Sequence, residues 1–217
     1  MARRTPTIAA ALTVSAALLL TACGGSSSDA SKDKIKGADE GTKSPSASAS
    51  TSAAPGAARP EITIPHAFQL DFQGWNSGDS EEQAVLNDGR EQVRAGYAAI
   101  IANAPDADYL KFYDTAAGLS QDQKWIKTYT GKNLTLIGKA PVYDAKASML
   151  GGNKTRAVLS YCMDESKAYT KDRKTGKVEG NPAGTNPKVY YTATMQKSSQ
   201  GVWQTVSTNS KRGGCPS

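Results

Sequence analysis

The chain has 217 residues, of which 38% are hydrophobic and 21% charged, and its formal net charge at pH 7 is +6. Its three cysteines and single histidine, His66, show no metal-ligand spacing and argue against a zinc site. The sequence has no Gly-x-Gly-x-x-Gly, no P-loop and no Gly-x-Ser-x-Gly, which excludes the enzyme classes that depend on them.

Residues 1–22 have the pattern of an export signal peptide. Arg3 and Arg4 supply a positive start, and residues 8–20 are apolar apart from one threonine and one serine. These 13 residues suit the apolar region of a signal peptide, whereas a membrane-spanning helix needs roughly 20. The paired arginines raise the alternative of twin-arginine export, but the residues that follow them do not support it.

Residues 20–23, Leu-Thr-Ala-Cys, directly follow the apolar region and resemble the lipobox of bacterial lipoproteins. The resemblance implies that the Cys23 thiol is acylated and that the signal is cleaved before Cys23. The mature chain would then be anchored, through its lipid, at the extracytoplasmic face of the cell membrane. The alternative is an ordinary cleaved signal peptide followed by an incidental cysteine.

The remaining cysteines are predicted to form a disulfide. If Cys23 carries lipid, one pair is left, Cys162 and Cys215, in an exported and therefore oxidising compartment. This bond would close a loop of 53 residues, for which the chain-entropy treatment gives roughly 4 kcal/mol. Two free thiols are the alternative.

Residues 23–60 are predicted to be a lipidated N-terminus followed by a disordered linker. From residue 24 onward the segment contains no aromatic residue and one large aliphatic, Ile35. Such a composition buries too little apolar surface to offset the entropy of ordering. A flexible segment of this length spans roughly 30–35 Å. It is either a spacer that clears the membrane surface or low-complexity sequence without a tuned length.

Residues 61–217 are predicted to form one folded domain, which begins with helices. Alternating Phe68, Leu70 and Phe72 indicate a strand or an extended lead-in packed on the domain. Ser80 and Gln83 have capping-box spacing and are predicted to start the longest helix, which ends before Pro105.

Gly89 and Gly96 lie near the apolar face of this helix and would let another element approach closely, although Asn87-Asp88-Gly89 also suits a turn. A short helix is expected over residues 106–114. A third helix is expected from Ser120 to Gly131.

The rest of the domain is predicted to be a meander of strands. Expected strands run from Leu134 towards Tyr143 and over residues 155–163, with a hairpin over 168–179. A strand with Val189 to Met195 on alternate positions follows. In the last strand, Val202, Gln204 and Val206 are expected on one face, with Trp203 opposite. Helices followed by antiparallel strands indicate an α+β fold.

This order of elements resembles the nuclear transport factor 2-like cone fold, which ketosteroid isomerase and scytalone dehydratase share. More narrowly, the chain resembles a group of actinobacterial lipoproteins with such a domain. The matching features are the lipobox, the Ser/Ala-rich linker, Tyr-Cys-Met-Asp at residues 161–164, the Thr-Gly hairpin, Val202-Trp203 and Cys215. The resemblance implies a curved antiparallel sheet with helices packed on it.

The cone fold can enclose a pocket, and some members are enzymes that use an aspartate base with tyrosine or aspartate donors. The candidate residues of these types are Asp71, Tyr97, Tyr113, Asp114, Tyr143, Tyr161 and Tyr191. None lies in a motif that aligns with a catalytic one, so no catalytic residue is assigned. The tyrosines are expected to pack in the core and sheet, and His66 is expected to be a surface or packing residue.

Charge is distributed unevenly in the predicted domain. Residues 61–131 carry a net charge of −6 and residues 132–217 a net charge of +9. At the predicted hairpin, residues 167–177 contain five basic residues and one acidic residue, Asp172. These candidates for contact with an anionic surface are Lys167, Lys171, Arg173, Lys174 and Lys177. The alternative is a solvated loop.

These patterns predict a lipid-anchored, non-catalytic interaction or ligand-binding module of the cell envelope. The expected partners are the membrane, through the lipid on Cys23, and an anionic envelope polymer or another envelope protein. No cofactor and no nucleic acid are expected. One alternative is a pocket enzyme of the isomerase or dehydratase kind. Another is a structural envelope protein that contacts an anionic surface through the basic hairpin.

Overall fold

The computed structural model describes residues 57–216. The predicted signal peptide, Cys23 and residues 24–56 of the predicted linker lie outside the described residues. In chain order, the elements are β1 (Phe68–Phe72), α1 (Ser80–Ala102), α2 (Asp108–Tyr113), α3 (Ala116–Thr130), β2 (Leu134–Leu150), β3 (Arg156–Asp164), β4 (Lys167–Asp172), β5 (Val178–Glu179), β6 (Lys188–Lys197) and β7 (Trp203–Arg212).

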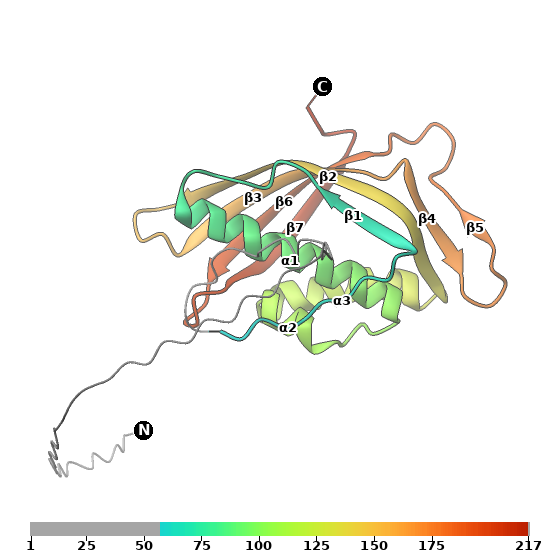
Figure 1. Cartoon of the computed structure of the whole chain (residues 1–217), viewed down its shortest axis with the longest axis horizontal. Coiled ribbons are helices and arrows are strands. Elements are labelled where there is room, and N and C mark those ends of the chain that lie inside the picture. Colours follow the sequence, from blue (N-terminus) through green and yellow to red (C-terminus); the bar gives the residue numbers. More distant parts are fainter. Residues whose placement is uncertain (1–56, 217) are drawn as a thin grey trace, which may run out of the picture. The chain divides into compact units, whose positions relative to one another are not determined.

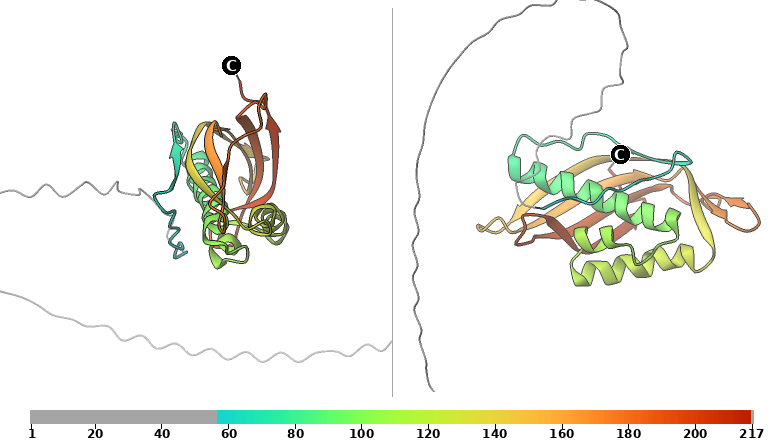
Figure 2. Two further views of the ribbon diagram at one scale, coloured as in Figure 1. Left: turned by 90° about the vertical axis from the view of Figure 1, so that its right-hand side faces the viewer. Right: turned by 60° about the horizontal axis from the view of Figure 1, so that its bottom comes forward.

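All seven strands form one sheet in the order β5-β4-β2-β3-β6-β7, with β1 paired to β2. The β1–β2 pair is parallel, and the other pairs are antiparallel. Figure 1 shows a curved sheet with α1, α2 and α3 on one side of it, and the turned views in Figure 2 agree. The α+β fold class, with helices packed on a curved antiparallel sheet, is therefore confirmed.

Strand β2 has 17 residues and organises the sheet. Its first part, Leu134–Lys139, pairs with β4, and its second part, from Val142, pairs with β3. The register shifts between Tyr143 and Lys146, where Asp144 has a positive φ of 53°. Such a bulge bends a strand and increases its twist.

Helix α1 is continuous through Gly89, so the turn that Asn87-Asp88-Gly89 also suited does not form. A Cβ atom at Gly89 would lie closer than 3.0 Å to the Leu159 side chain of β3. The glycine therefore lets α1 lie directly on the sheet, as its position on the apolar face predicted.

The helix starts differ from the capping patterns read in the sequence. Asp79, not Ser80, caps α1, and its side chain accepts hydrogen bonds from the Glu81 and Glu82 amides. The third helix begins at Ala116 rather than Ser120, because Thr115 caps it by accepting a hydrogen bond from the Gly118 amide. The predicted start of α1 at Ser80 is therefore confirmed although its cap is the preceding residue, and the predicted start of the third helix was wrong by four residues.

Within β7, Trp203 lies on the face opposite Gln204 and Val206, as predicted, whereas Val202 precedes the strand and is buried. Val202, Trp203 and Thr205 are buried, whereas Gln204 and Val206 are partly exposed. The β6–β7 register shifts where Thr194 pairs with Ser207 and Met195 with Thr205, so Val206 is the extra residue of a bulge.

Residues 57–60, which the sequence assigns to the linker, lie against the domain. Ala57 packs on the core, and the Arg59 guanidinium lies 2.7 Å from a carboxylate oxygen of Asp88. Asp88 is 2% exposed and also accepts a hydrogen bond of 2.8 Å from the Trp203 amide. A residue near the start of the described chain and the first residue of its last strand thus meet on one side chain of α1.

Cys162 of β3 and Cys215 form a disulfide, as the cysteine count predicted. Their Cα atoms are 5.8 Å apart. Cys162 pairs with Tyr190 of β6, and Tyr190 pairs with Lys211 of β7. The bond therefore ties the segment after β7 to a strand two positions away in the sheet.

Candidate functional site

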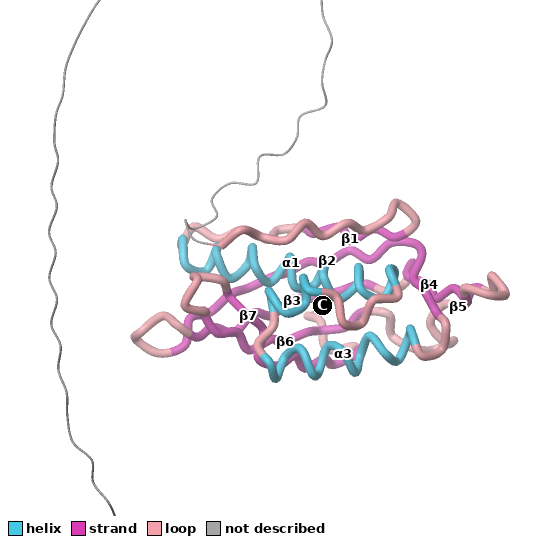
Figure 3. The backbone as a smooth tube through the Cα atoms, turned by 90° about the horizontal axis from the view of Figure 1, so that it is seen from below, coloured by secondary structure: helices cyan, strands magenta, loops and turns pink. Residues whose placement is uncertain are grey.

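A pocket of about 180 Å³ lies between the helices and the concave side of the sheet. Figure 3 shows the domain from below, with α1 and α3 running across the strands that contribute to it. The lining residues come from α1, α3, β3, β6 and β7. They are Gln92, Val93, Gly96, Tyr97, Gln121, Asp122, Trp125, Tyr161, Met163, Tyr191, Thr208 and Ser210.

Two features of the sequence hold α3 in place beside the pocket. A Cβ atom at Gly96 would lie 2.8 Å from Trp125, so the glycine lets the Trp125 ring pack against α1. The Gln121 side chain donates to the carbonyl of Thr208 and accepts a hydrogen bond of 3.0 Å from its amide. Gln121 and Ser210 are exposed, so the mouth of the pocket lies between α3 and β7.

Four aromatic side chains form the walls. Tyr97 and Trp125 meet edge to face with ring centroids 5.5 Å apart. Tyr161 and Tyr191 stack with centroids 5.0 Å apart and planes 13° from parallel. Burial raises the pKa of Tyr97, Tyr161 and Tyr191, so all three phenols are neutral at physiological pH.

The polar end of the pocket is a pair of buried carboxyl groups joined by one amide. The side-chain amide of Gln92 on α1 donates a hydrogen bond of 2.6 Å to Asp122 Oδ2 and one of 3.3 Å to Asp114 Oδ1. Asp122 lines the pocket and is 8% exposed, whereas Asp114 lies behind it and is 3% exposed. Because one amide NH₂ group serves both carboxyl groups, they are held as a unit.

Burial is the largest cause of the raised pKa of both groups. It raises the pKa of Asp114 to about 8, with a further contribution from the negative charge of Asp122. The pKa of Asp122 rises to about 6, and the hydrogen bond from Gln92 opposes both shifts. Near pH 7 the pair therefore carries about one negative charge, on Asp122 at the pocket.

Tight packing fixes the position of Asp114. The backbone of Asp114 forms an isolated parallel β-bridge with Thr205 of β7. The Thr115 amide donates a hydrogen bond of 2.9 Å to the Thr205 carbonyl. A Cβ atom at Gly118 would lie closer than 3.0 Å to that carbonyl oxygen. Among the described residues, Asp114 Oδ2 and Thr205 Oγ1 are buried without a hydrogen-bond partner.

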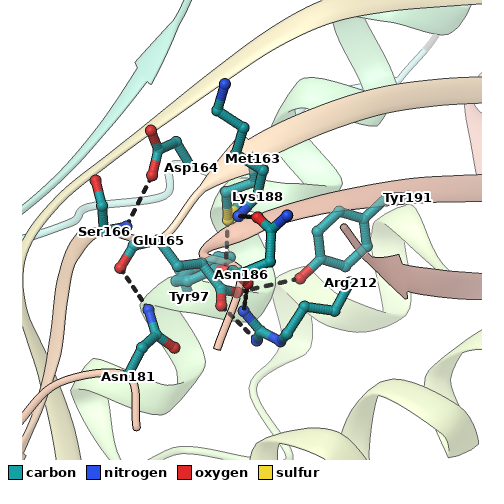
Figure 4. A network of polar contacts seen from close by, with 10 residues as sticks. All are labelled: Tyr97, Met163, Asp164, Glu165, Ser166, Asn181, Asn186, Lys188, Tyr191 and Arg212. Atoms are coloured by element: carbon teal, nitrogen blue, oxygen red, sulfur yellow. Dashed lines mark hydrogen bonds and ion pairs between the residues drawn. The ribbon is translucent and has the colours of Figure 1, made fainter. Parts of the chain in front are cut away.

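A polar network lies beside the aromatic wall (Figure 4). The Tyr191 hydroxyl is 3.5 Å from Glu165 Oε1, and the Tyr97 hydroxyl donates 2.9 Å to the Met163 sulfur. Glu165 also forms an ion pair of 2.7 Å with Arg212. These contacts lock the orientation of Tyr97 and Tyr191 and already engage their hydroxyl groups.

The structure brings some of the sequence candidates together and separates others. Tyr97, Tyr161 and Tyr191 line the pocket, and Asp114 lies directly behind it. The other three do not line it. Asp71 lies on β1 and is 3.5 Å from Lys139, Tyr113 packs against Phe112, and Tyr143 is on β2.

Sequence reasoning missed Asp122, Gln92 and Trp125. A signal for Asp122 exists, because residues 118, 122 and 126 are four apart and so share one face of α3. That face is buried, and burial of a carboxyl group costs free energy unless the group has a hydrogen-bond partner or a function. No local signal links Gln92 to Asp122, because 30 residues separate them.

A second hollow, of about 400 Å³, lies around β1 and includes His66, Asp71, Arg94 and Lys139. Its charged groups already have protein partners. Arg94 donates 2.7 Å to the Ile62 carbonyl and pairs with Glu91, and Lys139 pairs with Asp71. Within residues 57–216, no group of three or more potential metal-binding side chains is present.

The basic hairpin of β4 and β5 is exposed, but its five cations are not equivalent. Arg173 donates to the Ile100 and Ile101 carbonyls and so stabilises the C-terminal end of α1. Lys177 pairs with Glu179 at 2.6 Å. Lys167, Lys171 and Lys174 make no ion pair in the described part of the chain.

No protein-family model matches the sequence, and no curated protein matches it. Solved structures do match the fold. The intermembrane space region of chloroplast protein ARC6 is 11% identical, with a TM-score of 0.46 over 60% of this chain and 96% of its own. A ketosteroid isomerase-like protein from Erwinia carotovora atroseptica is 11% identical, with a TM-score of 0.42 over 62% and 97%.

A nuclear transport factor 2-like superfamily protein from Salmonella enterica is 15% identical, with a TM-score of 0.37 over 58% of this chain and 89% of its own. At these identities and TM-scores the likeness concerns the fold, and no activity is taken from it. Within the described residues, no helix is both long enough and apolar enough to cross a bilayer.

Proposed function

We propose that the protein is a lipid-anchored, extracytoplasmic module that binds a small ligand and does not catalyse a reaction. The observation that carries the proposal is the pocket between α1, α3 and the sheet. Aromatic walls with a few convergent polar groups are typical of ligand sites. A cavity of about 150 Å³ holds a benzene-sized molecule. A site of about 180 Å³ therefore suits a compact ligand.

The state of two of the three tyrosine hydroxyls at the pocket, those of Tyr97 and Tyr191, favours binding over catalysis. An oxyanion donor must point at the reacting atom and be free to bind it. The hydroxyls of Tyr97 and Tyr191 are instead directed to Met163 and Glu165. The walls are thus held rigid by the protein itself, which lowers the entropic cost of ligand binding.

A pocket enzyme is the second candidate, and Asp122 favours it. A carboxyl group in a pocket, with its pKa raised to about 6 and with a second carboxyl group behind it, is suited to proton transfer near neutral pH. The two candidates make different predictions for a bound molecule, since an enzyme converts it and a binding module releases it unchanged.

A fragment screen tests the pocket. Full-length protein is screened by thermal shift against compact fragments, with a Ser210→Trp variant as the matched control. Ser210 is exposed in β7 and lines the mouth, so a tryptophan there blocks the pocket at little cost to the core. Fragments that stabilise the natural protein and not the variant support the proposal. Equal shifts in both proteins contradict it, and chemical change in a bound fragment favours the enzyme.

The membrane anchor is tested separately with Cys23→Ala. We expect the natural chain to partition into membrane or detergent phase and the variant to remain aqueous, because acylation supplies the apolar anchor. A variant that still partitions into membrane contradicts the anchor.

The basic hairpin gives the anchored domain a candidate contact with anionic lipid or wall polymer through Lys167, Lys171 and Lys174. Variants that test this contact should change the three lysines and keep Arg173, because Arg173 caps the C-terminal end of α1.

A further inference from the structure

We infer that the pocket takes a compact organic cation, with a methylated ammonium group as the recognised chemistry. The inference rests on the proposed binding function and names the ligand class. Its basis is the combination of four aromatic rings and one carboxylate in a site of about 180 Å³. Aromatic faces attract cations, and cages of such rings bind quaternary ammonium groups.

The rings come from four different elements and surround one space. Tyr97 of α1, Trp125 of α3, Tyr161 of β3 and Tyr191 of β6 all line the pocket. They form two contacting pairs, Tyr97 with Trp125 and Tyr161 with Tyr191. Because Gly96 lets Trp125 approach α1 and Glu165 holds Tyr191, the walls are positioned before any ligand arrives.

The charge at the pocket selects against anions. Among the described lining residues, Asp122 is the one with a charged side chain, and no lysine or arginine is present. Gln92 donates to one oxygen of Asp122. A buried carboxylate without a cationic partner is costly, and a bound cation would remove that cost.

The dependence on pH follows from the groups that face Asp122. These are Asp114 at the end of α2, Tyr161 on β3 and the uncharged Gln92 on α1. The phenol is neutral, and Asp114 is mostly protonated at neutral pH, so Asp122 is the group that changes charge between pH 5 and 7. Binding of a cation would favour the ionised form of Asp122 and would release protons near pH 6.

A set of matched probes tests the inference by isothermal titration calorimetry with the full-length chain. The probes are choline, its uncharged carbon analogue 3,3-dimethylbutan-1-ol, and the anion 3,3-dimethylbutanoate. We expect choline to bind at least about tenfold more tightly than the uncharged analogue and the anion not to bind. Glycerophosphocholine as a fourth probe distinguishes a lipid headgroup from a free cation, since it carries the same ammonium group on a phosphodiester.

Two further measurements test whether Asp122 causes the preference for a cation. The substitution Asp122→Asn should weaken choline binding about tenfold or more, because asparagine is of similar size but lacks the buried negative charge. Asp106→Asn is the control, since Asp106 is exposed and outside the pocket. In the natural protein, choline binding should weaken as pH falls from 7 to 5, with proton release near pH 6. In Asp122→Asn both pH effects should disappear.

The outcomes separate this inference from the proposed function. If the uncharged analogue binds as tightly as choline and Ser210→Trp abolishes both, the binding pocket is supported and the cation preference is overturned. If no probe binds while screened fragments do, the cation inference alone fails. If neither probes nor fragments bind in a way that Ser210→Trp removes, both fail.

Discussion

Asp114 is a carboxyl group that the fold keeps away from both water and positive charge. Burial is the main reason that its pKa rises to about 8, and the nearby Asp122 adds to the shift. A single donor, Gln92, serves both groups. The folded protein therefore holds a proton on this pair over a pH range in which the unfolded chain releases it.

This proton makes stability depend on pH in a direction opposite to that of a salt-bridged aspartate. Between the ordinary value of 3.8 and about 8, the folded state binds more protons than the unfolded state. The free energy of unfolding should therefore fall as pH rises through this range, by up to about 1.4 kcal/mol per pH unit for one group. In Asp114→Asn this decline should be much smaller, as measured by urea unfolding from pH 4 to 8.

The matched control is Asp106→Asn, which changes an exposed aspartate near α3 whose bond to Gln123 an asparagine oxygen can also accept. Its pH profile should follow that of the natural protein. An Asp114→Asn profile as steep as the natural one would show that the proton is not held there.

At this scale the sequence predicted part of the site. Asp114 and three of the four aromatic residues of the pocket were among the candidates. The grouping was not predictable, since Gln92, Asp114 and Asp122 become neighbours through helix packing. The sequence also offered Asp71, Tyr113 and Tyr143 as candidates, because residue type alone does not distinguish pocket walls from sheet and core positions.

Helix α3 and strand β7 approach each other at one small residue. A Cβ atom at Gly118 would overlap the Thr205 carbonyl oxygen, which is a backbone atom and cannot move aside alone. The same contact region holds Thr115 against Thr205 and brings Asp114 beside β7. The position of the pocket's polar end therefore depends on this glycine.

Replacement of this glycine should be strongly destabilising. Gly118→Ala forces α3 away from β7, and overpacking of this kind costs about 1–3 kcal/mol or more. Gly78→Ala is the control, because a Cβ atom there would meet nothing within 4 Å. Chemical denaturation should show a large loss for Gly118→Ala and a near-neutral effect for Gly78→Ala. Equal stability of the two variants would contradict the role of Gly118.

Local sequence patterns predicted the elements better than their ends. The apolar periodicity of α1 and the alternation in β3 depend on burial of one face, which the structure shares. The start of α3 was missed because Thr115 caps it while its backbone bonds to β7. The alternation of Trp203 with Gln204 and Val206 was predicted, but the bulge at Val206 was not, because a register shift leaves no mark in the strand's own sequence.

At the scale of the whole domain, the disulfide joins its end to its middle. The bond between Cys162 and Cys215 closes a loop of 53 residues that contains β4, β5, β6 and β7. It limits the conformations of the unfolded chain, and loss of such a bond typically costs 2–5 kcal/mol.

Reduction should therefore lower the melting temperature measurably. We expect thermal unfolding with and without dithiothreitol to differ, and the double substitution Cys162→Ser/Cys215→Ser to match the reduced protein. The substituted protein should no longer respond to the reductant. If reduction leaves the melting temperature unchanged, or if mass mapping without reductant finds the two cysteines unlinked, the stabilising bond is contradicted.

The contact of Arg59, Asp88 and Trp203 also has a consequence for the order in which the chain folds. Asp88 receives its hydrogen bond from an amide 115 residues further along the chain. Contacts of such long range form late, because a large loop must close first. A chain that emerges amino end first therefore cannot complete its core until the final strand is present. Nascent chains that end before Trp203 should accordingly remain sensitive to protease.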